Sequence, residues 1–301
     1  MARTPTTDGR GRQVDRSAVT ALVPVAAIVP FWLLALAVPW LVARMLTDVR
    51  FWVLPAGWIG LGVLLFVPAV QVAVLSPVLG ARRMLAHEAD RIEPVWNEVI
   101  SRVGLRRHRY TIRIIDSTEL NAFACGGHLL IVTSFALEQL SPRQLAGVLA
   151  HELSHHLGLH TAALTVGHWL SLPVVLLARI GFFLQNVARA ATDSFAAAST
   201  LLTVVGRLLT LALRAASWMF LAALFASDAL ANLVGRASEF EADRRVVRLG
   251  YGRHLAEALR VVIHLGGGAR AIGWRARLAA SHPPARTRVA RIEAMMRHPS
   301  R

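Results

Sequence analysis

Long apolar blocks alternate with polar segments along the 301 residues of this chain. In the first block, residues 19–42, the one polar side chain is Thr20, and a second block runs over residues 51–79. Each block exceeds the ~20 residues that a helix needs to cross a bilayer core. The pattern predicts two transmembrane helices within residues 18–79, preceded by a disordered basic tail at residues 1–17.

The remainder of the chain divides into two polar parts with an apolar part between them. Residues 80–160 are charged and helical in pattern at first, with Pro94 suited to the first turn of a new helix. Two β-rich runs follow, at residues 110–115 and 129–133, and a glycine-containing turn segment separates them. Residues 161–234 are apolar and predict two further membrane-embedded helices, and residues 235–301 are polar and helical.

Composition supports a membrane protein and argues against a nucleic-acid-binding one. The chain is 55% hydrophobic, whereas soluble domains have about 45–50% apolar residues. The formal charge of +15 is concentrated beside the apolar blocks, because residues 236–301 carry 14 arginines against 5 acidic residues. Basic segments flanking membrane spans are typical of cytoplasmic regions. The single cysteine, Cys125, excludes an intrachain disulfide, and the first block is too long for a cleaved signal peptide.

One predicted helix carries a metal-binding pattern. It opens with Ser141 as N-cap and Pro142 at the first position, and it continues into His151, Glu152 and His155. At about 100° per residue these three side chains project within one arc of the helix. Two imidazoles one turn apart can hold one zinc ion, and Glu152 can take a proton from a water beside it. The five-residue pattern is common by chance, but a capped helix that follows two strands favours the zinc hypothesis.

A catalytic zinc site also needs a third protein ligand. One known pattern places a third histidine six residues after His155, with a glycine halfway. Gly158 fits this pattern, but position 161 is Thr161, and an apolar span begins there. We therefore interpret His156 and His160 as neighbours on the helix and not as ligands.

A later helix offers a carboxylate instead. Glu239 and Asp243 are four positions apart and so lie on one helical face. Glu239 can complete a site of two histidines and one glutamate, and Asp243 can accept the outer N–H of His151 and fix its tautomer. Spacing alone supports an ordinary surface role for Glu239 equally well. Glu241 points away from this face and is interpreted as a solvated charge.

Four motifs occur in order over residues 85–296, and together they resemble one family. The combination is similar to the HtpX-like gluzincin family of membrane metallopeptidases, which also includes the CAAX prenyl endopeptidases. The resemblance implies a mainly α, polytopic membrane protein with a cytoplasmic zincin-like metalloprotease domain that contains a small β-sheet. The motifs are Asn121-Ala-Phe-Ala, His151-Glu-Leu-Ser-His155, Arg236-Ala-Ser-Glu-Phe-Glu-Ala-Asp243, and Ser281-His-Pro-Pro284 with Arg286, Arg288 and Ile292 after it.

The resemblance implies roles that spacing does not give. The family's third zinc ligand falls on Glu239. Asn121, Ala122 and Phe123 become substrate-binding candidates, because the corresponding strand pairs with an extended substrate. His282 becomes a candidate for stabilising the oxyanion of the reaction.

These inferences lead to one functional hypothesis. The chain is expected to be a zinc metalloendopeptidase with one Zn²⁺, in a bacterial inner membrane, that cuts peptides of membrane or misfolded proteins on the cytoplasmic side. His151, His155 and Glu239 can share an ion only on one side of the bilayer. Residues 160–236 must therefore cross an even number of times, and two crossings fit. Peptide substrates and the lipid bilayer are the expected partners, and nucleic acid is not.

Three alternatives remain at this stage. A dedicated processing peptidase of the CAAX type would use the same chemistry on one target. A non-catalytic zinc-containing membrane sensor is disfavoured, because a structural site has no use for Glu152 as a base. A transporter could use His168, Arg179 and Arg214 as intramembrane polar groups, but it would need more spans than the chain offers.

Overall fold

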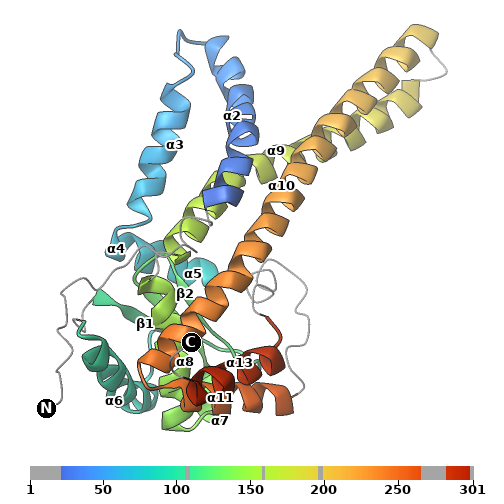
Figure 1. Ribbon diagram of the computed structural model, residues 1–301. Coiled ribbons are helices and arrows are strands. Elements are labelled where there is room, and N and C mark those ends of the chain that lie inside the picture. Colours follow the sequence, from blue (N-terminus) through green and yellow to red (C-terminus); the bar gives the residue numbers. More distant parts are fainter. Residues whose placement is uncertain (1–21, 106–108, 158–159, 196–198, 266–282, 299–301) are drawn as a thin grey trace, which may run out of the picture. The chain divides into compact units, whose positions relative to one another are not determined.

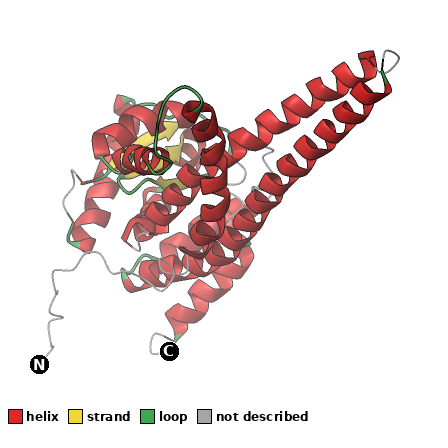
Figure 2. Cartoon of the chain, turned by 90° about the horizontal axis from the view of Figure 1, so that it is seen from above, coloured by secondary structure: helices red, strands yellow, loops and turns green. Residues whose placement is uncertain are grey.

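The protein is mainly helical, with one small sheet, as the sequence predicts (Figures 1 and 2). The computed structural model describes residues 22–105, 109–157, 160–195, 199–265 and 283–298. The chain forms two compact units. The first contains residues 64–165 and the chain from 232 onward, and the second contains residues 22–63 and 166–231.

The second unit is built from apolar helices. In the described part of the chain, three helices are long and apolar enough to cross a membrane, or four if a broken pair is counted as one span. Two tryptophans join helices of this unit: Trp58 and Trp169 stack with ring centroids 4.5 Å apart. Each indole N–H donates to the other residue's carbonyl oxygen, at 3.3 and 2.9 Å. The three helices of membrane length are α2 (Leu22–Arg44), α9 (His160–Phe195) and α10 (Thr200–Arg248), of which α9 and α10 contribute their apolar parts to this unit. The shorter helix α3 (Val53–Leu64) is the first half of the broken pair.

The apolar block at residues 51–79, predicted to hold one membrane span, is broken into two helical pieces. Helix α3 ends at Leu64, and the chain becomes helical again at Pro68. Proline has no backbone N–H and fixes its φ angle, so it is well suited to the first turn of a new helix. The second piece comprises α4 (Pro68–Val70), a π-helical turn η1 (Gln71–Leu75) and α5 (Ser76–Leu79).

Three strands form the only sheet among the described residues, in the order β1-β3-β2. They are β1 (Thr111–Ile115), β2 (Ala122–Cys125) and β3 (Leu129–Thr133). Strand β3 is buried along its whole length and pairs in parallel with β1 and antiparallel with β2. Gly126 turns the chain between β2 and β3 at a positive φ of 70°, which glycine adopts without strain. This order leaves β2 at an edge of the sheet.

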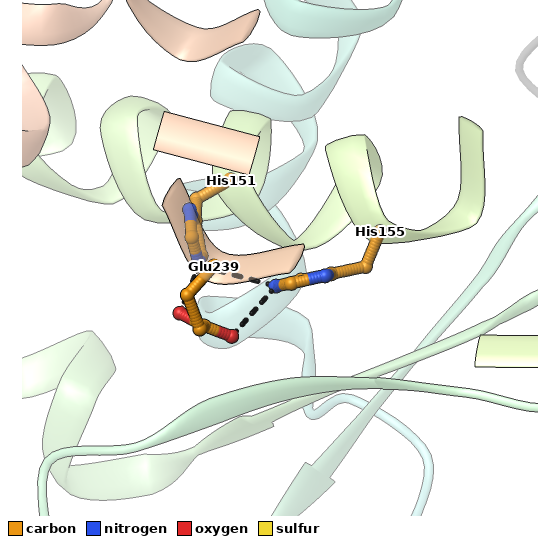
Figure 3. Close-up of side chains that lie close together, drawn as sticks. All are labelled: His151, His155 and Glu239. Atoms are coloured by element: carbon orange, nitrogen blue, oxygen red, sulfur yellow. Dashed lines mark hydrogen bonds and ion pairs between the residues drawn. The ribbon is translucent and has the colours of Figure 1, made fainter. Parts of the chain in front are cut away.

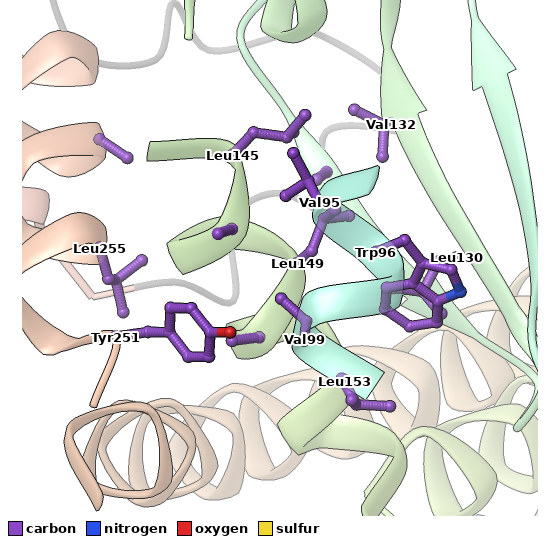
Figure 4. Packing of buried hydrophobic residues seen from close by; sticks show 14 of the residues in the cluster. Val95, Trp96, Val99, Leu130, Val132, Leu145, Leu149, Leu153, Tyr251 and Leu255 are labelled. Carbon is purple, nitrogen blue, oxygen red and sulfur yellow. The ribbon is translucent and has the colours of Figure 1, made fainter. Parts of the chain in front are cut away.

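The core of the first unit lies between this sheet and the surrounding helices (Figure 4). Helix α6 packs Val95, Trp96 and Val99 into this core. The helix is continuous through Pro94, so the helix start predicted there is wrong. The apolar face of α6 outweighs the roughly 3 kcal/mol that an interior proline costs. The helices are α6 (Ala86–Val103), α7 (Ser134–Gln139), α8 (Pro142–Leu157), α11 (Gly252–His264) and α13 (Ala285–Arg297).

Helix α8 is fixed at its start and along its side. Its N-terminus has the predicted cap, since the Ser141 N–H donates to Gln144 Oε1 at 2.8 Å and the Gln144 N–H donates to Ser141 Oγ at 3.4 Å. Further along, Gly147 lies against the backbone of α11, and a Cβ atom at this position would be 2.4 Å from the Leu255 nitrogen. The close approach of α8 and α11 therefore requires glycine at position 147.

We expect Gly147→Ala to destabilise the first unit, because the added methyl group meets backbone atoms that cannot rotate away. Overpacking of this kind costs about 1–3 kcal/mol. Thermal unfolding of the purified protein measures the loss. The matched control is Gly60→Ala in α3, where a Cβ atom meets nothing within 4 Å and no loss is expected. Equal melting temperatures for the two variants would contradict this account of the α8–α11 contact.

Candidate metal centre

Three potential metal ligands from two helices meet in the first unit (Figure 3). His151 and His155 come from α8 and Glu239 comes from α10, and all three are buried. Their ligand atoms lie within 4.8 Å of one another. His155 Nε2 is 3.3 Å from His151 Nε2 and 3.1 Å from Glu239 Oε1, and His151 Nε2 is 3.2 Å from Glu239 Oε2. Two imidazoles and one carboxylate are a donor set that suits Zn²⁺ with a position left open.

Asp243 lies where it can orient one of these histidines. It is fully buried one helical turn after Glu239, and its Oδ1 is 3.1 Å from His151 Nδ1. A carboxylate at this nitrogen holds a proton on Nδ1. When Nε2 has lost its proton, as a metal ligand must, its lone pair would face the shared site. The distance is compatible with the role that the sequence suggests for Asp243, and that role stays a prediction.

Arg288 is a site residue that sequence reasoning did not assign. It is buried on α13, and its guanidinium donates to both oxygens of Asp243, at 2.7 and 3.0 Å. Its Nη1 lies 3.2 Å from Glu239 Oε2. One signal in the sequence could have identified it: Arg288 is four positions before Ile292, so a charge lies on the helix face that enters the core.

The charges of this cluster perturb one another. Burial and the Arg288 guanidinium lower the pKa of His151, but the carboxylates of Glu239 and Asp243 outweigh them and raise it to about 9. Burial alone would raise the pKa of Asp243, yet Arg288 and His151 hold it below its ordinary value. Burial opposes the charge of Arg288, and Glu239 and Asp243 raise its pKa despite that burial. The carboxyl group of Asp243 is therefore held in its ionised form. A metal ion bound at His151 would displace the proton that the neighbouring carboxylates favour.

Glu152 and the edge strand lie on elements that pack together. Glu152 is buried directly after His151 on α8, and α8 packs against β2. Ala122 and Phe123 belong to β2, and Asn121 immediately precedes it. The Thr133 hydroxyl holds Asn121 by accepting from its N–H at 3.1 Å and donating to its carbonyl oxygen at 2.9 Å. The three residues proposed to contact substrate thus lie at the sheet edge beside the helix that carries the histidines.

Comparison with known proteins identifies the family. Residues 86–296 match the family described as Peptidase family M48. The chain belongs to this family. It is 31% identical over 192 residues to Protease HtpX of Nitrosococcus oceani, a match that covers 61% of this chain and 64% of the relative. The crystal structure of S. mikatae Ste24p has the same fold, with a TM-score of 0.50 and 17% identity over 92% of this chain and 64% of that one.

Membership in family M48 makes the chain a metallopeptidase relative, and the likeness to Ste24p extends to the fold alone. In each comparison, the match covers less than two thirds of the relative's own length. The mainly helical fold with a small sheet and several apolar helices long enough for a membrane agrees with the fold that the sequence predicts.

The remaining residues that the sequence analysis considered lie away from the three potential ligands or outside the described residues. His282 lies outside the described residues. His156 is a buried core residue, since its Nε2 lies 3.2 Å from the Leu129 carbonyl oxygen and its Nδ1 lies 3.2 Å from Thr161 Oγ1. Glu241 pairs with Arg244 and Arg248 on the far side of its helix, as expected for a surface charge.

We expect Asp243→Asn to weaken metal binding by about 10–100-fold, because it removes the charge that orients His151 and pairs with Arg288. Titration of the metal-free protein with zinc, against a chelator of known affinity, measures this loss. The matched control is Glu241→Gln, which neutralises a carboxylate two positions earlier that has no contact with the site. Equal zinc affinities for both variants would exclude Asp243 as an orienting residue.

Proposed function

We propose that this chain is a zinc-dependent endopeptidase whose ion is held by His151, His155 and Glu239. The observation that supports the proposal is the convergence of these three buried donors. They come from two helices, and Glu239 follows His155 by eighty-four positions in the sequence. A bound zinc ion supplies Lewis acidity, which polarises a peptide carbonyl and lowers the pKa of water toward neutrality.

The protein's own residues would transfer the proton, orient a ligand and stabilise the developing charge. Glu152 takes the proton of the attacking water and returns it to the leaving amine, in the role of general base and then general acid. Asp243 keeps His151 in the tautomer that presents Nε2, and Arg288 holds Asp243 in place. The family resemblance makes His282 the candidate to stabilise the developing negative charge on the substrate oxygen.

The register of the sheet identifies which backbone groups of β2 are open to a peptide. The Thr133 N–H donates to the Asn121 carbonyl oxygen at 3.0 Å, and Phe123 stands opposite Ile131. Hydrogen-bonded and non-hydrogen-bonded positions alternate along an antiparallel pair. Asn121 and Phe123 therefore direct their backbone groups to β3, whereas Ala122 and Ala124 direct theirs to the open edge. An extended peptide would pair with these two alanines.

The proposed substrates are membrane or misfolded proteins that are cut on the cytoplasmic side of a bacterial inner membrane. Support comes from the apolar helices, from the basic segments beside them, and from the likeness to a protein named Protease HtpX. Main-chain pairing at a strand edge supplies affinity that does not depend on the substrate's side chains, which suits a broad range of unfolded substrates better than one dedicated target.

Two variants test the reaction and the site separately. We expect Glu152→Gln to retain one zinc per chain and to lose about 10²–10⁴-fold in cleavage rate, because the base is gone and the ligands remain. We expect Glu239→Ala to lose both zinc and activity. Metal analysis and cleavage of several unrelated unfolded membrane proteins provide the two measurements.

The control for both variants is Glu241→Ala, which is expected to match the native protein in zinc content and rate. Undiminished cleavage by purified Glu152→Gln would remove Glu152 as the base. Full zinc content in Glu239→Ala would remove the third ligand. Cleavage of only one of the unrelated substrates would favour a dedicated processing enzyme.

A proline scan of β2 tests the substrate strand. We expect Ala124→Pro to lower kcat/KM by about three- to tenfold, because the substrate backbone loses one hydrogen bond to the Ala124 N–H. The melting temperature and the zinc content should stay unchanged. Phe123→Pro removes a donor of the sheet itself and should destabilise the fold. An unchanged kcat/KM in Ala124→Pro would contradict pairing at this edge.

A further inference from the structure

A cavity of about 620 Å³ in the first unit lies apart from the metal centre, between the helical segment 68–76 and strand β1. The apolar side of the cavity comes from the block at residues 51–79, through Pro68, Ala69, Val72 and Ala73. Four polar side chains also line it, and no acidic residue does. These are Ser76, Arg83, Thr111 and Arg113.

Two arginines stand opposite each other in this cavity. The Arg82 N–H donates to the Ile114 carbonyl oxygen at 2.8 Å, and the Ile114 N–H donates back at 3.0 Å. This isolated antiparallel bridge continues the sheet by one position beyond β1. In its register the next pair is Arg83 and Arg113. Like charges directly across from each other on neighbouring strands are destabilising.

The neighbouring Arg82, unlike Arg83 and Arg113, has carboxylates among the described residues that balance its positive charge. Arg82 is held by Glu88 at 2.8 Å and by Asp116 at 2.6 Å. In contrast, Arg113 donates to the carbonyl oxygen of Ile112 at 3.2 Å, and the described residues give neither Arg83 nor Arg113 a carboxylate. Burial and the charge of Arg83 lower the pKa of Arg113. This pair therefore lacks the anion that its neighbour has.

A hydroxyl group provides independent support for a ligand. Ser76 is buried, and its Oγ has no hydrogen-bond partner among the described residues. A buried hydroxyl without a partner costs free energy. Thr111 and Arg113 lie on the same face of β1, because alternate residues of a strand share a face. The lining of the cavity thus includes two arginines and two hydroxyl residues, side chains whose donors bind phosphate groups.

We infer that this cavity binds the phosphate of an anionic phospholipid. The lipid source is favoured over a free anion by the apolar side of the cavity and by the exposure of Val67, Val74 and Val78 along the same segment. Basic pockets beside membrane-embedded segments bind lipid headgroups in this manner. The site does not share residues with the metal centre, so the inference does not rest on the proposed function.

Native mass spectrometry of the full chain in detergent tests this inference, with phosphatidylglycerol and phosphatidylcholine as probes. We expect the native protein to retain phosphatidylglycerol preferentially. The double variant R83Q/R113Q should bind phosphatidylglycerol more weakly, by about tenfold for each arginine replaced, because each substitution removes a charge-assisted contact to the phosphate. Ser76→Ala should show a smaller loss. The variants are expected to fold, since R83Q/R113Q removes a like-charge contact, and thermal unfolding checks this.

The matched control is R253Q, which removes an exposed arginine that pairs with Glu257 on α11 and should leave lipid binding unchanged. Phosphatidylglycerol binding by R83Q/R113Q within twofold of the native level would overturn the proposed site, and so would an equal loss in R253Q. Protection against unfolding by inorganic phosphate alone, equal to that by phosphatidylglycerol, would overturn the lipid assignment in favour of a free anion.

Discussion

The arrangement of the first unit depends on the balance of buried charge around Asp243 and Arg288. Glu152, Glu239 and Asp243 are buried together with one guanidinium. An isolated buried carboxylate is costly, and removal of one partner from such a cluster leaves the others uncompensated. Helices α8, α10 and α13 must therefore meet for any of these charges to be tolerated. With neutral imidazoles the cluster keeps two formal negative charges, the charge that one divalent cation balances.

The same helix that carries the histidines is attached to the sheet by a polar contact. His156 lies next to His155 and approaches the carbonyl oxygen of Leu129, which opens β3. Leu129 stands opposite Thr111 on one side and Cys125 on the other. Because α8 also packs against β2, the ligand helix and the edge strand form one structural piece. A peptide added to β2 would lie at a fixed distance from Glu152.

Sequence reasoning predicted the parts of this candidate site that depend on local periodicity. The pattern of His151, Glu152 and His155 follows from helix geometry alone, and Asp243 follows from its spacing to Glu239. The pairing of α8 with α10 could not be derived from spacing, because eighty-four residues separate His155 from Glu239, and a family resemblance was needed. Arg288 was missed because its partners lie on two other helices, His151 on α8 and Asp243 on α10. Its position on a core-facing stripe was the available signal.

The fold shows the same division between local and tertiary information. Strands β1 and β3 and the start of α8 were readable from alternation and capping residues. The break at Pro68 and the continuity of α6 through Pro94 were not, because packing decides whether a proline starts a helix or lies within one. The opposition of Arg83 and Arg113 depends on a single backbone bridge, at Arg82 and Ile114, which no pattern in the sequence marks.

The open edge of β2 has a consequence for what could reach a metal ion bound by His151, His155 and Glu239. Ala122 and Ala124 offer amide and carbonyl groups with almost no side chain around them, so the edge can read whether a chain is extended but not which residues it contains. A helix or a folded strand has already used its own amides and cannot join. Under the proposed function, an intact neighbour in the bilayer would be spared, and damage that unravels a few residues would be the feature that is recognised.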